Sequence, residues 1–307
     1  MSELSFSQSV KEEIISKINT AAKAEACLYG MLLCANELTA DEILLLTELD
    51  KAAEFFRRGV EKICGRGVLD IRETERGGGQ VMYSLSVSSR EARDKLFSHF
   101  GIGEGRQRTR ERYPKQSLYP QMTAGMFLSC GSISDPNKGY HMEFVMPTLE
   151  LCNYLGLLLI ENFDMLAKNV ERKGHQVLYF KESDNIMDML ALMGASGSYF
   201  DLFYVKQMKD MRNKINRGVN CVNANIEKSI RAAEKQIEDI ELIDETRGLD
   251  SLPDNLREIA LIRYENPDYN LSDLGAALKP PISRSGANHR LQKIAAIAEE
   301  IRKQQEG

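Results

Sequence analysis

Two short apolar stretches with a glycine at the same position constrain this chain more than any other feature. Leu118 to Gly131 (LYPQMTAGMFLSCG) and Ala26 to Glu37 (ACLYGMLLCANE) both have a helical apolar pattern, and Gly125 and Gly30 occupy matching places in them. A glycine inside a helix costs roughly 1 kcal/mol relative to alanine, so two in the same context need a reason. Close approach of two helix backbones is one, and it predicts that these helices pack together. The alternative is a pair of unrelated core helices.

The pattern after each glycine helix is repeated as well. After the first helix we expect a strand at 43–49, a helix at 50–64, a hairpin of 68–73 and 81–87 turning at 77–79, and a helix at 89–99. After the second helix the same order recurs at 140–146, 148–161, 165–171 with 176–181, and 183–193. The repeat predicts one α+β domain made of two α-β-α-β-β-α copies, with the glycine helices on the pseudo-twofold axis.

The residues of the second glycine helix resemble the motif of the LAGLIDADG homing endonucleases, because Thr123 to Gly131 (TAGMFLSCG) lies over that motif letter by letter. Gly30, Gly125 and Gly131 are expected to be structural, because small residues stand where two helix backbones would touch. Further polar segments are similar to the WhiA family of bacterial transcription factors, and this second resemblance covers nearly the whole chain. These segments are Gly131-Ser132-Ile133-Ser134-Asp135-Pro136, Met211-Arg212-Asn213 with Asn216-Arg217 and Asn220-Cys221, and Ser283-Arg284-Ser285-Gly286 with Asn288-His289-Arg290-Leu291. The family implies transcriptional control tied to cell division, sporulation septation or chromosome segregation.

The acids that a LAGLIDADG nuclease needs are missing from their expected positions. Such enzymes place one carboxylate near the end of each axial helix to hold the divalent ions that activate water. Ala35 and Cys130 stand there, and neither side chain holds magnesium. Glu37 is rotated away if the helix continues, and Asp135 lies beyond the helix end. The four histidines are scattered without metal-ligand spacing, so we predict no catalytic residue, no metal, no cofactor and no enzyme activity.

Length and composition fit an ordinary soluble chain of two or three domains. The chain has 307 residues, of which 43% are apolar and 28% charged. No apolar run approaches the ~20 residues of a membrane span, and the N-terminus lacks a signal-peptide pattern, so we expect a cytoplasmic, nucleoid-associated protein without membrane contact. The six cysteines contain no C-x-x-C pair and are expected to be reduced.

The domain boundaries follow from breaks in these patterns. We expect an N-terminal helix within 1–22 that begins at about Ser7, with Ser9 and Glu12 at capping-box spacing, then the duplicated domain at 23–205. Its copies are placed at about 23–100 and 117–195, joined by a mobile basic linker at 101–116 that contains arginines 106, 108, 110 and 112. Phe200 to Lys206 has the pattern of an extended segment. A helical connector is expected at 206–250, with its long helix beginning at about Gln207, and a last domain at 251–307.

Basic and amide side chains gather at the start of the connector although the net charge is -5. Lysine, arginine and asparagine reach phosphates and base edges, which makes this segment a candidate DNA contact. Asparagine packing on a neighbour is the alternative. The candidate residues are Lys209, Arg212, Asn213, Lys214, Asn216, Arg217 and Asn220.

The last domain has the pattern of a helix-turn-helix module. Helices are expected at 254–264, from Asn270 or Ser272 to Leu278, and from Ser283 or Ser285 to about Lys303, the third with a basic, amide-bearing first half. The arrangement resembles the fourth region of sigma factors, and a protein-binding three-helix module is the alternative. The predicted DNA-binding residues are Ser283, Arg284, Ser285, Asn288, His289, Arg290 and Lys293, of which Arg284 and the last four are expected to be exposed on the first turns.

The sequence thus favours a transcriptional regulator that binds double-stranded DNA through its last domain. A sigma factor, RNA polymerase or a second regulator is the expected class of protein partner. Two alternatives are open at this stage: an active or degenerate endonuclease, and a structural adaptor at the division site.

Overall fold

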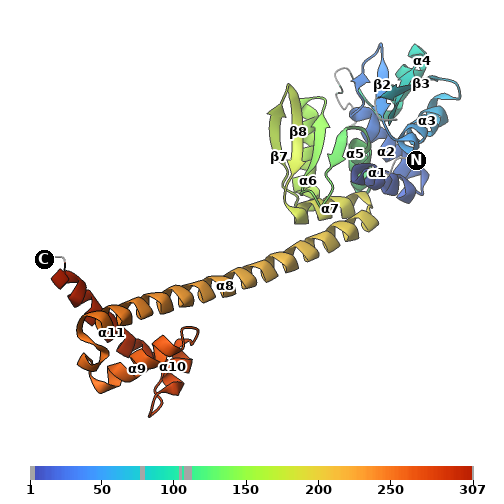
Figure 1. Cartoon of the computed structure of the whole chain (residues 1–307). Coiled ribbons are helices and arrows are strands. Elements are labelled where there is room, and N and C mark those ends of the chain that lie inside the picture. Colours follow the sequence, from blue (N-terminus) through green and yellow to red (C-terminus); the bar gives the residue numbers. More distant parts are fainter. Residues whose placement is uncertain (1–3, 77–79, 104–105, 107–112, 306–307) are drawn as a thin grey trace. The chain divides into compact units, whose positions relative to one another are not determined.

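The structure is a computed structural model that describes residues 4–76, 80–103, 106 and 113–305. The chain divides into two compact units, Met1–Lys209 and Asp210–Gly307 (Figure 1). The expected turn at 77–79 and the linker arginines 108, 110 and 112 lie outside the described residues. Within the described part of the chain, no helix combines the length and apolar character that a membrane crossing requires.

The first unit contains the predicted duplication. Its first copy comprises α2 (Ala21–Leu33), β1 (Glu37–Leu38), β2 (Ile43–Thr47), α3 (Asp50–Cys64), β3 (Leu69–Arg76), β4 (Gln80–Val87) and α4 (Arg90–Phe100). After a short 3-10 turn, η2 (Gln116–Leu118), the second comprises α5 (Tyr119–Cys130), β5 (Gly131–Ile133), β6 (Met142–Met146), α6 (Leu149–Phe163), β7 (Lys168–Arg172), β8 (His175–Phe180) and α7 (Ser183–Met193). The two antiparallel sheets have the same order, β1-β2-β4-β3 and β5-β6-β8-β7. The duplicated α+β fold is therefore confirmed.

Each copy differs from the expected order by one short strand. β1 and β5 follow the axial helices directly and pair with β2 and β6, so each copy is α-β-β-α-β-β-α. The first axial helix ends at Leu33 instead of reaching Glu37, and Glu37 begins β1. Strands of two or three residues are too short to leave a period-2 pattern, which is why the sequence did not show them.

The axial helices α2 and α5 pack against each other between the two sheets (Figure 1). A Cβ atom on Gly30 would lie 2.0 Å from the carbonyl oxygen of Met122, and one on Gly125 would lie 1.9 Å from that of Cys27. Only glycine fits where backbones approach so closely. Gly131 begins β5, and a Cβ atom there would lie 2.2 Å from Cδ2 of Phe127.

Helix α1 (Phe6–Lys17) begins one residue before the expected start at about Ser7, but with a different capping pair. Its capping box is formed by Ser5 and Gln8, whose side chains bond to each other's backbone N–H, and the predicted pair Ser9 and Glu12 lies inside the helix. The earlier start brings Phe6 into contact with the core, into which Val10 and Ile14 are fully buried. Both pairs have capping-box spacing, so the apolar residue just inside the helix decides between them.

Helix α8 (Ser196–Arg247) also begins earlier, and the expected extended segment from Phe200 to Lys206 is helical. The Glu13 carboxylate accepts hydrogen bonds from the backbone N–H groups of Gly197 and Ser198 and from the Ser198 hydroxyl, the latter two at 2.9 and 2.7 Å. These bonds satisfy helix N-terminal donors that would otherwise lack partners. A cap supplied from α1 thus overrides the strand-like aromatic composition of the segment.

The second unit is a helix-turn-helix domain, as predicted. After α8 and a 3-10 turn, η3 (Leu249–Ser251), it comprises α9 (Asp254–Glu265), α10 (Leu271–Ala277) and α11 (Arg284–Gln305). Asn270 and Ser283, each one of two predicted candidates, cap α10 and α11. Ile240 and Ile243 at the end of α8 share the core of these helices, and Arg302 of α11 pairs with the buried Asp239 at 2.6 Å. The last turns of α8 therefore belong to the same packed body.

Candidate nucleic-acid interface

The first half of α11 separates a buried side from an exposed one. Ala287, Leu291 and Ile294 are buried in the domain core. Their packing leaves the opposite side open to solvent and fixes the direction in which it faces. The side chains that are exposed there are those of Ser285, His289, Gln292 and Lys293. Arg284 is also exposed, and Asn288 is half-buried at the edge.

Arg290 was expected on the exposed side of α11, and the structure places it elsewhere. It is half-buried, and its Nη1 donates to the backbone oxygen of Asn255 at 3.2 Å. Arg290 lies three residues after the buried Ala287 and so on nearly the same side of the helix. The Arg290 side chain therefore points toward α9. In the structure Arg290 therefore links α11 to the start of α9.

The turn between α10 and α11 depends on a glycine that the sequence analysis did not single out. A Cβ atom on Gly275 would lie 2.5 Å from the carbonyl oxygen of Ile282, and the Ile282 N–H donates to the Gly275 oxygen at 2.9 Å. The Ser283 hydroxyl then accepts from the Gly286 N–H at 3.2 Å and begins α11. Gly275 sets how closely α10 approaches the first turn of α11.

A buried arginine stabilises the turn between α9 and α10. Arg263 is 2% exposed, and its Nη1 donates to the backbone oxygens of Asn266, Pro267 and Tyr269 at 3.4, 3.2 and 2.7 Å. Burial lowers the pKa of Arg263, and the nearby Asp268 acts in the opposite direction. The sequence analysis missed this residue because arginine is rarely buried, and only the three-dimensional turn shows the carbonyls that it binds.

The candidate DNA contacts of the connector divide into two groups. Lys209 is held by the first unit: its Nζ donates to the Pro136 oxygen at 2.6 Å and lies 4.8 Å from the ring centroid of Tyr140. The remaining six are exposed on α8 within the second unit. These are Arg212, Asn213, Lys214, Asn216, Arg217 and Asn220. The structure thus brings them onto one helix but leaves Lys209 in a separate role.

Cations stand at the carboxyl ends of both axial helices, where LAGLIDADG nucleases carry acids. Arg106 donates to the backbone oxygens of Leu33, Ala35 and Asn36 at 2.8, 2.9 and 3.3 Å. Burial lowers the pKa of Arg106, and Cys34, Glu37 and Cys130 act in the opposite direction. Within the linker that was expected to be mobile, Arg106 thus has three hydrogen bonds to the first copy. Its charge lies at the negative end of the α2 dipole, which is favourable.

Lys11 has the corresponding role at the end of α5. Its Nζ donates to the Leu128 oxygen at 3.2 Å and lies 5.7 Å from the ring centroid of Phe127. Burial lowers the pKa of Lys11, while Cys130 and Glu48 raise it. A hydrogen bond with Cys130, together with burial, raises the pKa of the Cys34 thiol. All six cysteines are free thiols.

This arrangement does not fit a magnesium site. The two positions that would need a carboxylate carry the methyl group of Ala35 and the thiol of Cys130. The side chains of Arg106 and Lys11 place two positive charges nearby. Asp135 is engaged elsewhere, because its Oδ1 accepts from the backbone and side-chain nitrogens of Asn137 at 2.9 and 3.0 Å. Among the described residues, no group of three or more histidine, cysteine or acidic side chains is placed to hold a metal ion.

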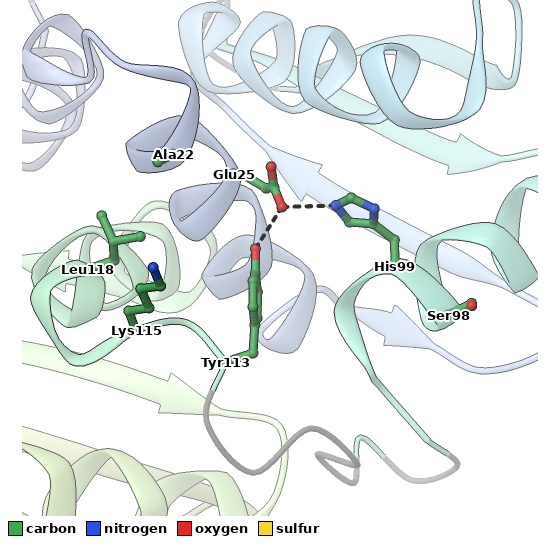
Figure 2. A pocket seen from close by; sticks show the side chains of 7 residues that line it. All are labelled: Ala22, Glu25, Ser98, His99, Tyr113, Lys115 and Leu118. Atoms are coloured by element: carbon green, nitrogen blue, oxygen red, sulfur yellow. Dashed lines mark hydrogen bonds and ion pairs between the residues drawn. The ribbon is translucent and has the colours of Figure 1, made fainter.

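A cavity of about 780 Å³ lies at the other end of α2, lined by Ala22, Glu25, Ser98, His99, Tyr113, Lys115 and Leu118. Figure 2 shows one carboxylate oxygen of Glu25 between two partners, His99 Nε2 at 2.9 Å and the Tyr113 hydroxyl at 3.0 Å. Tyr113 also packs edge-on against Tyr29, with ring centroids 5.1 Å apart. These contacts fasten Tyr113, near the end of the linker, to the first copy, which gives the network a structural role.

The fold and the exposed side of α11 define the chain as a helix-turn-helix protein with an added LAGLIDADG-like domain. Two family models match: the WhiA LAGLIDADG-like domain at residues 120–212 and the WhiA C-terminal HTH domain at residues 215–298. The chain belongs to the WhiA family.

Relatives and solved structures extend over most of the chain. The proteins named "Probable cell division protein WhiA" from Ruminiclostridium cellulolyticum and Lachnoclostridium phytofermentans are 36% and 37% identical, covering 98% and 97% of this chain and 99% and 100% of the relatives. The protein of the same name from Caldicellulosiruptor saccharolyticus is 50% identical over 73% of this chain and 66% of the relative. The crystal structure of full-length DUF199/WhiA from Thermatoga maritima has a TM-score of 0.57 at 22% identity, covering 97% of this chain and 99% of that one. It shows the same fold.

Proposed function

We propose that this protein is a sequence-specific regulator of transcription and that the first half of α11 enters the major groove of double-stranded DNA. One observation carries the proposal. Ser285, His289 and Gln292 point away from the core on one rigid helix face. In helix-turn-helix proteins the base-reading side chains cluster at the start of the recognition helix in this way.

The side chains of this face have separable roles. Asn288, His289 and Ser285 carry donors and acceptors for base edges, whereas Arg284 and Lys293 are cations suited to phosphate. Ser283 holds the first turn through Gly286, and Arg290 supports the helix from the side through Asn255. The exposed connector residues add a second phosphate-contacting surface, which comprises Arg212, Asn213, Lys214, Asn216, Arg217 and Asn220.

We also propose that the LAGLIDADG-like domain is catalytically inactive and serves as a platform for a protein. Ile43, Leu45 and Thr47 are buried, so Leu44 and Leu46 lie on the open face of the first sheet. Strand pairing places Asp70 and Arg72 on the same open face, where they form an ion pair at 2.7 Å. Ser84 and Ser86 of β4 lie between these residues, so the face mixes apolar and polar side chains and its one ion pair carries no net charge. A face without net positive charge suits a protein better than a phosphate backbone. A sigma factor, RNA polymerase or a second regulator is the proposed partner class.

Cell division is the process that we assign to this regulator, because its relatives bear the name "Probable cell division protein WhiA". The family resemblance adds sporulation septation and chromosome segregation. Nucleoid association follows from the proposed DNA binding.

The experiment is a comparison of binding to a preferred site, found by mapping bound DNA across the genome, with binding to random DNA. Asn288→Ala and His289→Ala should each cost about 1 to 3 kcal/mol on the preferred site and little on random DNA. Lys293→Ala should weaken both alike and lower the salt slope by about 0.9. Arg212→Ala is the control. If it removes site preference while the α11 variants retain it, the reading surface is the connector.

A second measurement tests the loss of catalysis. Incubation of plasmid with purified protein and magnesium or manganese should leave the plasmid supercoiled, because Ala35 and Cys130 supply no ligand for either ion. A variant that carries both Glu37→Gln and Asp135→Asn, which removes the first acid after Ala35 and the first after Cys130, controls for contaminating nuclease. Nicking by the parent protein that this variant lacks would contradict the proposed inactivity of the chain.

A further inference from the structure

Helix α8 carries a stripe of large apolar side chains that the second unit leaves open. Residues 210–232 are all exposed. Six of them have large apolar side chains, which recur every three or four positions and therefore lie on one face of the helix. They are Met211, Ile215, Val219, Val222, Ile226 and Ile230, with exposed fractions between 51% and 59%. Contiguous apolar surface of this kind marks an interaction site.

The spacing of this stripe is symmetric about its middle. The steps are four, four, three, four and four residues, so the centre lies between Asn220 and Cys221. A twofold rotation at that point places Met211 on Ile230, Ile215 on Ile226, and Val219 on Val222. The steps approach an eleven-residue repeat, which keeps the stripe nearly parallel to the axis of a straight helix. A second copy running in the opposite direction would therefore meet the stripe with the same set of side chains.

The two halves of the stripe also differ in shape. Val222, Ile226 and Ile230 line a groove of about 400 Å³ whose other wall is the loop from Pro267 to Asn270. Met211, Ile215 and Val219 are not among the residues that line this groove. In an antiparallel pair the projecting half of each copy would enter the groove of the other, and the two contacts would be identical. This is the geometry of an isologous twofold interface.

Charge at the edge of the stripe favours the same direction. Arg212 and Glu227 are fifteen residues apart, which places them within about 60° of each other around the helix and on the same side of the stripe. Both side chains are exposed, and Glu227 lies 3.6 Å from Arg231 on its own helix. In an antiparallel pair of identical helices, the same edge of each helix faces the other copy. Arg212 of each copy would therefore lie near Glu227 of the other, which gives two equivalent ion pairs.

We propose that a second copy of this chain packs antiparallel on α8 between Met211 and Ile230, with its twofold axis between residues 220 and 221. The occupant is a second copy because the stripe is complementary to itself in spacing, shape and charge. A single helix pair buries less than the about 800 Å² per partner of a standard interface, so we expect a weak dimer. The inference goes beyond DNA binding and requires no DNA.

The first test is the mass of the full chain by sedimentation at concentrations from below to well above the micromolar range. The parent protein should pass from monomer to dimer. Ile226→Glu, which would bury two carboxylates, should raise the dissociation constant by about 100-fold or more. Ala224→Glu adds the same charge on the far side of the helix and should leave dimerisation unchanged. A parent protein that is monomeric throughout, or an Ala224→Glu effect equal to that of Ile226→Glu, overturns the proposal.

A charge exchange tests the register. Arg212→Glu should weaken the dimer by about threefold to tenfold, because two exposed ion pairs become repulsive. Adding Glu227→Arg to that variant should restore the parent affinity, since the pairs are re-formed with their charges exchanged. A double variant that is as weak as the single one shows that the two positions do not meet.

Cross-linking tests the direction. In a Cys221→Ser background, Ile215→Cys and Ile226→Cys are prepared separately, with different masses, and oxidised alone and mixed. The antiparallel arrangement predicts a disulfide-linked heterodimer in the mixture and little dimer in either sample alone. Cross-linking of each variant with itself indicates a parallel pair and overturns the antiparallel one.

Discussion

A side chain on Gly125 of α5 would collide with the backbone of Cys27 on α2, because its Cβ atom would lie 1.9 Å from the Cys27 carbonyl oxygen. The reciprocal contact, between Gly30 and Met122, is as close. Since the obstacle in both cases is backbone, no rotation of a side chain relieves it. The two halves of the duplicated domain can therefore approach this closely only because Gly30 and Gly125 have no side chain.

Gly125→Ala should destabilise the protein by about 1 to 3 kcal/mol or more, although alanine is the better helix former, because the core must shift to admit the methyl group. The matched control is Gly218→Ala in α8, where a Cβ atom meets nothing within 4 Å. That change should be neutral or stabilising by up to about 1 kcal/mol. Chemical denaturation of the full chain measures both. Equal effects would mean that the axial helices can separate at no cost.

Arg106→Ala should destabilise the first unit by about 1 to 3 kcal/mol, because three carbonyl oxygens at the end of α2 lose a charged donor. Arg72→Ala removes an arginine whose ion pair with Asp70 is exposed, and should change stability by less than about 1 kcal/mol. Thermal melting distinguishes the two. If Arg106→Ala is as mild as Arg72→Ala, the contacts of Arg106 do not persist in solution.

Stability should depend on pH through Glu13. Burial alone would raise the pKa of this carboxyl, but bonds from the Ser198 side chain and from the backbone of Ser198 and Gly197 outweigh burial and lower it below its usual 4.5. A lowered pKa in the folded state means that the stabilisation is complete above the unfolded pKa and is lost as the pH falls through the folded one.

Glu13→Gln should therefore cost about 1 kcal/mol near pH 7, the value of a lost helix cap, and this difference from the parent should shrink below about pH 4.5. Glu234→Gln, on an exposed part of α8, is the control and should change little at either pH. Urea titrations at pH 7 and pH 3.5 give the comparison. A difference that is unchanged at pH 3.5 would show that the Glu13 charge is not what caps α8.

The sequence predicted those parts of the fold that rest on periodicity and on chemical type. The two glycine helices, the duplicated order of elements and the three helices of the last domain follow from apolar spacing and turn residues. What it missed depends on contacts between distant segments. The first turn of α8 is helical because Glu13 reaches it from α1, and Arg263 is buried because three carbonyls converge on it. Neither relationship leaves a local pattern.

The candidate interface shows the same division. The exposed half of α11 was recognised by its basic and amide residues, but Gln292 was passed over although helical spacing alone places it beside His289. Arg290 was included for its chemistry, and only the position of the Asn255 carbonyl shows that its guanidinium is engaged within the domain.

The last prediction compares Gln292 with Arg290. The two positions are about 200° apart around the helix, so their side chains point in different directions and their substitution should have different effects. Gln292 is exposed, and a glutamine amide can bond an adenine edge with two hydrogen bonds. Gln292→Ala should therefore reduce binding to the preferred site by about 1 to 3 kcal/mol while leaving stability and binding to random DNA unchanged. Arg290→Ala should lower the stability of the second unit by about 1 kcal/mol through the lost bond to Asn255.

Any loss of binding by Arg290→Ala should follow its loss of stability and should fall equally on the preferred site and on random DNA. Denaturation and DNA titration of the same preparations separate the two effects, with Gln304→Ala at the far end of α11 as a variant expected to keep DNA binding. If Arg290→Ala loses only site preference at full stability, its guanidinium leaves Asn255 and reads bases. If Gln292→Ala binds the preferred site as the parent does, the reading surface lies nearer to the start of α11.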